Sequence, residues 1–526
     1  MSSRQRVVVV TGGGGGIGAA IALELGRAGD YVVTVDPLVS LDGAQTLSSS
    51  EQTTADRIIA AGGAARASGV SVTDSPSVTA LLTELAEEFG GLDAVVNVAG
   101  ISRPTSYTAG ADADWTAVLE VHLDGYRNVL CAALPLMAAA GRGHILGVTS
   151  GSGWRAADTG AYGCAKRAVA ALTWQIGRQA PDGVTVNAIS PIAATRMVAG
   201  ALAAARKSTA ATGGLALNTM PDPDEIGPLG AHLVDATFTA CQGRVLFSAG
   251  SEAAVIDEPR LIEVVRANHL PYPARVLDAA IEKALVPAEK RQASSGGSNA
   301  RFGRAFERVA DEDPPPSAAT TCAVCADSDA VAADIAAALR AREIAVTTVD
   351  EPAALSDIPT LDAVVVALAD HPSMSNSAPQ WRRILEEHDG IVAQIDADTA
   401  WARAVARLAM STERHVRLVV VHDAATSGGR TRAQVSTQLS RAGHDATAGL
   451  VQHCCVSVET DYPPVDLIAH LVCSPHTGDL AGAELVAGPG WFGLRSHPHP
   501  TGSITYGGPQ IPEWFDDALQ EVVQPR

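Results

Sequence analysis

Three side chains between residues 150 and 166 have the types and spacing for acid–base chemistry. Tyr162 and Lys166 lie within AYGCAKRAVAALTWQIG, whose apolar residues repeat at helical intervals, so the phenol and ammonium share one helix face. A free tyrosine has a pKa near ~10, and a nearby positive charge lowers it toward neutrality. Ser150 can hydrogen-bond the oxygen of a reacting alcohol or carbonyl group. In isolation such a Tyr–Lys pair is usually a surface pair, so its meaning depends on the elements around it.

A glycine-rich turn near the N-terminus supplies that context. The apolar run 7–10 leads into TGGGGGIG at 11–18, and Ile21 and Leu25 continue at helical spacing. Glycines let the backbone turn tightly and approach a pyrophosphate, whose charge is stabilised at a helix N-terminus. The order strand, glycine turn, helix therefore predicts a dinucleotide site. The residues predicted to form it are Gly12, Gly15, Gly16, Ile17 and Gly18.

Other predicted strands end in residues that fit the same ligand. The strand 31–35 is followed by Asp36, about twenty positions past the glycines, where an acidic side chain holds ribose hydroxyls. Because its charge repels a ribose phosphate, we predict NAD rather than NADP. Further predicted contacts are Ser71 and Val72, beside the adenine, and Asn97, Ala99 and Gly100, where small residues after a strand leave room for a ligand.

The length, net charge and hydropathy of the chain argue against several classes of function. The chain has 526 residues, more than one hydrophobic core usually supports, so at least two domains are expected. A net charge of −20 argues against nucleic-acid and anionic-membrane partners, which require a basic surface. No apolar run approaches the roughly twenty residues of a membrane span, and the start has no signal-peptide pattern. We therefore expect a cytoplasmic protein with no membrane partner.

The cysteines do not predict a disulfide framework or a metal site. Eight cysteines are scattered through the chain, and Cys322 and Cys325 form a single CxxC pair. One such pair is a weak zinc signal, so we predict no metal and place both residues in a strand. Cys454 and Cys455, which follow His453, are likewise predicted to be buried strand residues.

Taken together, these motifs resemble the short-chain dehydrogenase/reductase family over about the first 255 residues. The motifs that carry the resemblance are TGGGGGIG at 11–18, Asp36, NVAG at 97–100, Ser150, YGCAK at 162–166 and VNAISP at 186–191.

The resemblance implies specific roles. Tyr162 would be the general acid/base, Lys166 would bind the nicotinamide ribose and tune the tyrosine, and Ser150 would orient the substrate oxygen. Pro191, Ile192 and Thr195 would hold the nicotinamide. The implied activity is NAD-dependent interconversion of a secondary alcohol and a ketone.

Three positions depart from the family pattern. His122 replaces the usual Asn, which predicts a modified proton relay with His122 as a fourth catalytic residue. Ser150 lies one residue closer to the tyrosine than usual, so Ser152 is a rival for its role. Ile192 replaces a glycine and would crowd or reshape the nicotinamide pocket.

The predicted substrate is a bulky, apolar small molecule. The loop 196–227 carries many apolar residues and is predicted to cover the substrate, although the same residues could pack on the core. VHLDG at 121–125 and ATRM at 194–197 resemble the hydroxyacyl-CoA dehydrogenase part of peroxisomal-type multifunctional enzymes. We therefore expect hydroxyacyl-CoA or steroid-like substrates.

The second half repeats the first without its motifs. Residues 291–319, rich in Ser, Gly, charge and Pro, are predicted to link a catalytic domain, 1–290, to a degenerate copy, 320–526. The predicted fold class is α/β, with two tandem Rossmann-like domains built on doubly wound parallel sheets. Aligning Asp350 with Asp36 places Ala326, Ala330 and Ala332 on Gly12, Gly16 and Gly18, and the copy has no YxxxK. We predict one cofactor per chain.

The copy also predicts how the chain assembles. Family members commonly pair through the helices after the fourth and fifth strands, and the second half keeps helical patterns there. One chain would imitate a dimer, and a homodimer would imitate the family's tetramer. The tail 497–512 could line the first domain's pocket or cover the sheet of its own half, and we expect the second arrangement.

Two other functions are compatible with parts of this pattern. A noncatalytic, nucleotide-sensing scaffold would need only the glycine turn, but the intact YxxxK favours an enzyme. An NADP-linked ketoreductase would keep the catalytic residues, but Asp36 disfavours its cofactor.

Overall fold

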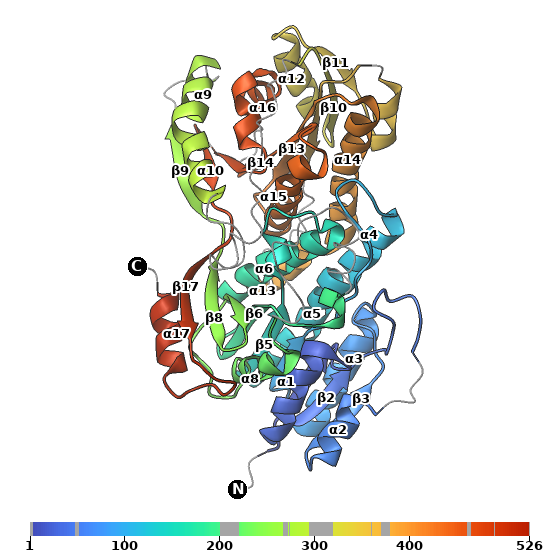
Figure 1. Ribbon diagram of the computed structural model, residues 1–526, viewed down its shortest axis with the longest axis vertical. Helices are drawn as coiled ribbons and strands as arrows, with labels where there is room; N and C mark the ends of the chain where they lie inside the picture. The colour runs from blue at the N-terminus through green and yellow to red at the C-terminus, as the bar shows by residue number, and fades with distance from the viewer. Residues whose placement is uncertain are drawn as a thin grey trace.

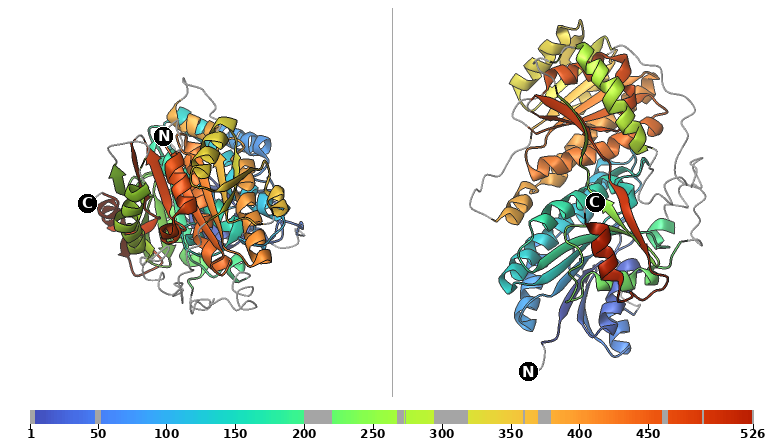
Figure 2. Two further views of the ribbon diagram at one scale, coloured as in Figure 1. Left: turned by 90° about the horizontal axis from the view of Figure 1, so that it is seen from above. Right: turned by 90° about the vertical axis from the view of Figure 1, so that its left-hand side faces the viewer.

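The computed structural model describes residues 4–47, 52–199, 220–266, 272, 274–293, 319–358, 360–369, 379–459, 464–488 and 490–524. These residues form two helix-covered sheets stacked along the longest axis of the molecule, the sheet built mostly from the first half below and the sheet built mostly from the second half above (Figure 1 and Figure 2, right). The predicted α/β class with two tandem domains is confirmed.

Within the described ranges, the first sheet has nine strands in the order β17-β8-β7-β6-β5-β4-β1-β2-β3. Its strands are β1 (Val7–Thr11), β2 (Tyr31–Val35), β3 (Ala64–Ser68), β4 (Ala94–Asn97), β5 (Gly143–Val148), β6 (Val184–Pro191), β7 (Val245–Ala249), β8 (Glu252–Asp257) and β17 (His499–Thr505). β1 to β7 are parallel, and the order reverses between β1 and β4. Such a reversal opens a crevice at the carboxyl ends of the strands, where α/β sheets bind ligands.

Helices cover both faces of this sheet because their apolar residues recur at helical spacing. They are α1 (Gly16–Arg27), α2 (Thr54–Ala60), α3 (Ser75–Phe89), α4 (Asp112–Leu119), α5 (Gly125–Ala140), α6 (Gly160–Arg178), α8 (Gly227–His232) and α17 (Phe515–Val523). In α1, for example, Ile21 and Leu25 are buried against β1 and β2.

The second sheet follows the same plan with fewer strands. Its described strands are ordered β11-β10-β12-β13-β14-β15-β16-β9 and include no counterpart of β3. They are β9 (Leu261–Arg266), β10 (Thr321–Ala326), β11 (Ala345–Thr348), β12 (Ala363–Leu368), β13 (Val416–Asp423), β14 (Val451–Val458), β15 (Glu484–Gly488) and β16 (Trp491–Arg495). The helices are α9 (Ala274–Ala280), α10 (Val286–Ala293), α12 (Asp329–Arg340), α13 (Gln380–Glu387), α14 (Ile391–Thr412), α15 (Ser427–Ala446) and α16 (Val465–Cys473). Cys322 and Cys325 lie in β10, and His453 to Cys455 lie in β14, as predicted.

The two sheets exchange their last strands. After β8 the chain crosses to the second sheet, where β9 pairs antiparallel with β16; after β16 it crosses back, and β17 pairs antiparallel with β8. Each sheet therefore contains strands from both predicted segments, 1–290 and 320–526, while most of the predicted linker lies outside the described residues. The prediction that the tail 497–512 covers the sheet of its own half is wrong, because β17 and α17 complete the first sheet (Figure 2, right).

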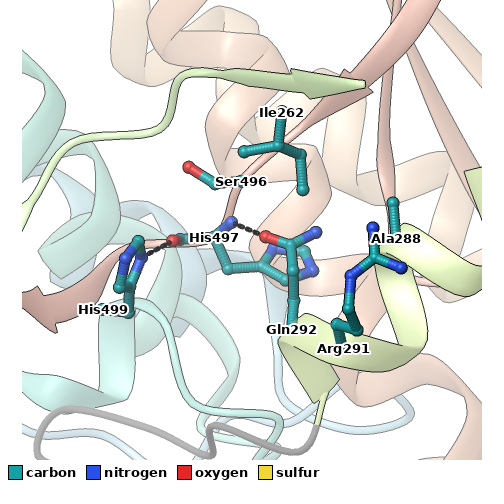
Figure 3. Close-up of a pocket in the computed structure, with 7 residues that line it drawn as sticks. All are labelled: Ile262, Ala288, Arg291, Gln292, Ser496, His497 and His499. Atoms are coloured by element: carbon teal, nitrogen blue, oxygen red, sulfur yellow. Dashed lines mark hydrogen bonds between the residues drawn. The ribbon is translucent and has the colours of Figure 1, made fainter. Parts of the chain in front are cut away.

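The crossing segments are tied together by polar contacts. Ser496 N donates to the Arg260 carbonyl at 2.7 Å, and Arg260 N donates to Ser496 Oγ at 3.0 Å. His497 N donates to Gln292 Oε1 of α10 at 2.7 Å, beside a small cavity of about 320 Å³ (Figure 3). These bonds fix the returning chain against α10 before it enters the first sheet.

Helices α4, α5 and α6 of the first domain face α13, α14 and α15 of the second. Trp115 of α4 and Trp381 of α13 belong to one cluster of buried side chains that runs through both domains. Arg403 of α14 donates to Asp112 at 2.7 Å, and Gln175 of α6 donates to Thr431 of α15 at 2.9 Å. The helices after β4 and β5 in the first domain, and after β12 and β13 in the second, thus form the contact between the domains.

Two searches of the described residues were negative. None of their helices has the length and hydropathy needed to cross a membrane. Nor do those residues include a group of three or more His, Cys, Asp or Glu side chains arranged to hold a metal ion.

Candidate active site

The turn between β1 and α1 has the geometry of a phosphate cradle. Gly12 and Gly16 have φ values of +64° and +53°, in the left-handed region where a side chain would be strained. A Cβ on Gly18 would lie 2.2 Å from the Gly12 carbonyl oxygen, so helix α1 can approach the turn only with glycine there. The N-cap, Gly15, has no side chain over the first turn, which leaves the helix N-terminus open to an anion.

Asp36 is held at the end of β2 by two backbone donors. Gly14 N donates to its Oδ2 at 3.0 Å, and Leu38 N donates to its Oδ1 at 2.8 Å. These bonds orient the carboxylate beside the glycine turn. The remaining lone pairs can accept hydrogen bonds from ribose hydroxyls.

A cavity of about 540 Å³ lies along the carboxyl ends of the central strands and brings together most of the predicted residues. Those that line it are Gly12, Gly15, Gly16, Ile17, Asp36, Ser71, Val72, Ala99, Gly100, His122, Ser150, Tyr162, Lys166, Pro191 and Thr195. Residues at or just after the ends of six strands, together with residues of α1 and α6, thus meet in one cavity.

Three predicted contacts do not line this cavity. Gly18 faces the Gly12 carbonyl, so it shapes the turn without facing the cavity. Asn97 is buried between strands, where its Oδ1 accepts a hydrogen bond from Thr11 Oγ1 at 2.8 Å. Ile192 packs beside the buried cluster that contains Trp154, so it does not crowd the cavity.

Tyr162 and Lys166 occupy the first turns of α6, but burial changes their expected acid–base properties. Lys166 Nζ lies 5.7 Å from the centre of the Tyr162 ring and donates to the Val148 carbonyl at 2.7 Å. Burial lowers the pKa of Lys166 to about 7. Burial raises the pKa of Tyr162, opposed by a hydrogen bond with Ser150 and by the charge of Arg155. The predicted lowering of the tyrosine pKa by Lys166 is therefore wrong, because desolvation of the phenol dominates.

His122 lies in a π-helical turn, Glu120–Asp124, between α4 and α5, a local irregularity frequent at functional sites. Its Nε2 lies 2.9 Å from the Ile101 carbonyl oxygen, and its ring is 5.3 Å from the Tyr162 ring in an edge-on arrangement. Burial, reinforced by the charge of Lys166, lowers the pKa of His122 to about 3, so the imidazole is neutral. Because Nε2 donates to a carbonyl, Nδ1 is an acceptor, and it has no partner among the described residues.

The geometry separates the two candidate serines. Ser150 lines the cavity at the end of β5 and accepts a hydrogen bond from Ser152 N at 3.2 Å. Ser152 lies in the following turn and is buried outside the cavity lining. Ser150 is therefore the serine placed to meet a substrate.

Sequence reasoning missed two parts of this cavity. The segment 38–47 folds back across it: Leu41 O accepts from Ser102 N at 2.9 Å, and Asp42 O accepts from Arg103 Nε at 2.8 Å. Arg196 Nη2 comes within 3.3 Å of where a Cβ on Gly15 would stand, so its guanidinium faces the glycine turn. In the sequence, Arg196 directly follows the predicted contact Thr195, and this position could have indicated that its side chain lies near the cofactor site.

The corresponding turn of the second domain lacks this geometry in its described residues. None of the described residues between β10 and α12 has a positive φ, and Asp327 and Asp329 stand at the start of the helix. At the ends of β12 and β13, Arg432 forms a two-point ion pair with Asp398, at 2.8 and 2.9 Å. In the described part of this region, a buried ion pair therefore stands where the first domain has its catalytic helix and cavity.

Comparisons with known proteins agree with this geometry. The family model for short chain dehydrogenase matches residues 6–205. A cis-4-hydroxycyclohexanecarboxylate dehydrogenase of Sinomonas cyclohexanicum is 35% identical over 48% of this chain and 98% of its own length. Peroxisomal multifunctional enzyme A of Dictyostelium discoideum is 33% identical over 38% of this chain and 44% of its own.

A solved structure extends the likeness to both halves. The N-domain of a bacterial malonyl-CoA reductase, determined with NADP, covers 90% of this chain and 95% of its own, with a TM-score of 0.61. At 16% identity the likeness concerns the fold alone. The tandem arrangement therefore occurs in another protein.

Proposed function

The chain belongs to the short-chain dehydrogenase/reductase family, and from that premise we propose that it is an NAD-dependent oxidoreductase that interconverts a secondary alcohol and a ketone. The observation that carries the proposal is the single cavity that joins the glycine turn and Asp36 to Ser150, Tyr162 and Lys166. A noncatalytic scaffold would not need these last three side chains in the same cavity.

The residues present fit a nicotinamide dinucleotide. The open N-terminus of α1 and the turn at Gly12–Gly16 would hold the pyrophosphate, Asp36 the ribose, and Pro191 and Thr195 the nicotinamide end. The cofactor would supply hydride acceptance or donation at carbon. NAD is proposed because the Asp36 carboxylate, fixed by two amides, repels a 2′-phosphate.

The side chains of this domain would handle the proton. In alcohol oxidation Tyr162 Oη takes the hydroxyl proton, and in ketone reduction it returns that proton. Ser150 would hydrogen-bond the substrate oxygen, and Lys166 would hold the nicotinamide ribose beside Tyr162. Neutral His122 can accept a hydrogen bond at Nδ1, which suits a member of a relay next to Tyr162.

The proposed substrate is bulky and apolar, of the hydroxyacyl-CoA or steroid-like class. Apolar side chains line the cavity near the catalytic residues: Ile101, Val121, Met197 and Val198. Most of the predicted lid, 196–227, lies outside the described residues. The name of one relative, a cis-4-hydroxycyclohexanecarboxylate dehydrogenase, supports an alicyclic secondary alcohol as substrate.

The assembly is also a proposal. The contact between α6 and α15 supports the idea that one chain imitates a dimer, and two chains would then imitate a tetramer. Light scattering should give twice the chain mass of 53.9 kDa, and a mass of one chain would contradict the homodimer. Cytoplasmic location stays a prediction from the sequence.

One assay tests the activity. Secondary alcohols, 3-hydroxyacyl-CoA esters and steroid alcohols are incubated with NAD or NADP, and reduced cofactor is followed by absorbance. We expect turnover with NAD that Tyr162→Phe lowers by about 10²–10⁴-fold, with NADH binding unchanged, because only the proton-transfer group is removed. Turnover that survives this substitution would contradict the mechanism.

A further inference from the structure

The degenerate domain reaches the catalytic loop of the first domain through one buried side chain. In the view of Figure 1, α15 of the second domain lies next to α6, which carries Tyr162. Gln438 of α15 donates both amide hydrogens across this contact, to the Ser152 carbonyl at 3.0 Å and the Arg155 carbonyl at 2.9 Å. Its side chain is buried, so water does not compete for these carbonyls.

The loop that Gln438 holds carries groups that act on Tyr162. Ser150 stands at one end and hydrogen-bonds the phenol, while Arg155 stands at the other and its charge lowers the pKa of that phenol. Gln438 donates to two backbone carbonyls of this loop, that of Ser152, which lies between the two groups, and that of Arg155 itself. A shift of this loop would therefore move both groups relative to Tyr162.

A second contact from the same region supports the start of α6. Tyr107 N donates to Asp158 Oδ1 at 2.8 Å, and Tyr107 Oη lies 3.1 Å from Nδ1 of His453 in β14. Asp158 also accepts from Gly160 N, the first residue of α6, at 3.3 Å. A Cβ on Gly443 of α15 would come within 3.0 Å of the Tyr107 ring, so glycine there lets the tyrosine approach.

We propose that Gln438 is a positioning residue for the reaction, by which the degenerate domain holds the loop 150–155 in register with Tyr162. This inference rests on the proposed function. It assigns the second domain a direct task in catalysis, in addition to packing against the first. Because one amide group holds two backbone carbonyls of the loop, the loop has little freedom to move. A displacement of catalytic groups by about 1 Å can lower a reaction rate about 100-fold.

The test compares two substitutions at the same interface. Gln438→Met keeps the shape of the side chain and removes both donors. Gln175→Met is the matched control, because Gln175 is also buried between α6 and α15, donates to Thr431, and like Gln438 has an Oε1 without a partner among the described residues. Gln175 is far along α6 from the catalytic loop.

We expect Gln438→Met to lower kcat by about 10- to 100-fold with an unchanged KM for NAD, while Gln175→Met leaves kcat unchanged at a similar loss of Tm. The rising limb of the pH profile for alcohol oxidation should move to higher pH, because Arg155 no longer faces Tyr162; Lys166 and His122, the other ionisable groups beside the phenol, stay in place. Gln438→Asn, one methylene shorter, should show the same changes if Gln438→Met does not fold. Wild-type kcat and pH profile in the Gln438 variants would overturn the proposal.

Amide hydrogen exchange separates this inference from the proposed function. Peptides covering 149–159 should exchange faster in Gln438→Met than in Gln175→Met, whatever the substrate. If the wild type oxidises no alcohol, the proposed function fails, but faster exchange still supports the positioning contact. Equal exchange in the two variants overturns it.

Discussion

The two domains differ at the turn after the first strand of each sheet and at the neighbouring strand ends. In the first domain the chain leaves β1 through glycines with positive φ, and a cavity opens beside Tyr162 and Lys166. In the second, the chain leaves β10 with negative φ, and the pair Arg432–Asp398 fills the interior at the strand ends. At this place the first domain therefore buries Lys166 beside an open cavity, whereas the second buries Arg432 in an ion pair with Asp398.

The difference extends to what each domain contributes to the other. The first domain holds all the predicted catalytic groups, while the second presents Gln438 and His453 to the loops around them. The second domain lacks the glycine turn and the YxxxK motif of the first, but it keeps the helices that form the contact between the domains. Four predictions test this contrast.

The largest effect is expected from exchanging residue types at one equivalent position of the two turns. Gly18→Ala puts a Cβ 2.2 Å from the Gly12 carbonyl, so the turn must move and NADH binding should be lost. Ala332→Gly, at the aligned position of the second domain, should leave NADH binding unchanged and cost about 1 kcal/mol as an interior helix glycine. Fluorescence titration with NADH measures the first effect and thermal melting the second. NADH binding retained by Gly18→Ala would remove the basis for the cofactor site.

The second effect concerns the buried ion pair. Arg432→Met leaves Asp398 buried without its partner, which should lower the free energy of unfolding by about 3–5 kcal/mol. NADH affinity of the folded fraction should not change, because the pair lies in the second domain. Urea denaturation measures the free energy of unfolding, and NADH titration measures the affinity. If NADH affinity falls by more than the unfolded fraction accounts for, the second domain takes part in cofactor binding.

A smaller effect tests the carboxylate at the end of β2. Asp36→Asn removes the charge but keeps the shape, so NAD affinity should fall about ten-fold and discrimination against NADP should weaken. Asp350, its aligned counterpart in the second domain, offers the matched control, and Asp350→Asn should change neither affinity. Unchanged preference in Asp36→Asn would contradict the proposed NAD specificity.

The smallest effect is the pH dependence of stability caused by Lys166. Burial lowers its pKa from 10.5 to about 7, so between these values the unfolded chain binds a proton that the folded chain does not. Stability from this group therefore rises with pH across that window, by at most about 1.4 kcal/mol per pH unit. Lys166→Met should flatten the slope of unfolding free energy measured from about pH 7 to about pH 9. An equal slope in both proteins would show that the ammonium is not buried as described.

Much of the site could be predicted because its motifs are local. Gly12, Asp36, Ser150, Tyr162 and Lys166 each stand at a fixed distance from a strand or helix that periodicity identifies. Parallel strands deliver their carboxyl ends to one edge, so these residues meet whatever the surrounding loops do.

The misassigned residues depend on neighbours that are distant in sequence. Asn97 was expected in the cavity but bonds Thr11 of the adjacent strand, and Ile192 packs beside the cluster around Trp154. The pKa of Tyr162 depends on desolvation by the assembled fold, which spacing to Lys166 does not report. Arg196 reaches the glycine turn from the segment after β6, although β5 and β4 lie between β6 and β1 in the sheet, so neither sequence distance nor strand order predicts this approach.

The sequence by itself determined the α/β class, the duplication, the single glycine turn and the acid–base residues, because these follow from periods and spacings within short segments. Only the tertiary structure decided that β9 and β17 change sheets, that the tail completes the first domain, and that Gln438 holds the catalytic loop. Strand exchange and contacts between domains join residues hundreds of positions apart, and their free energy comes from pairing and burial that no local pattern encodes.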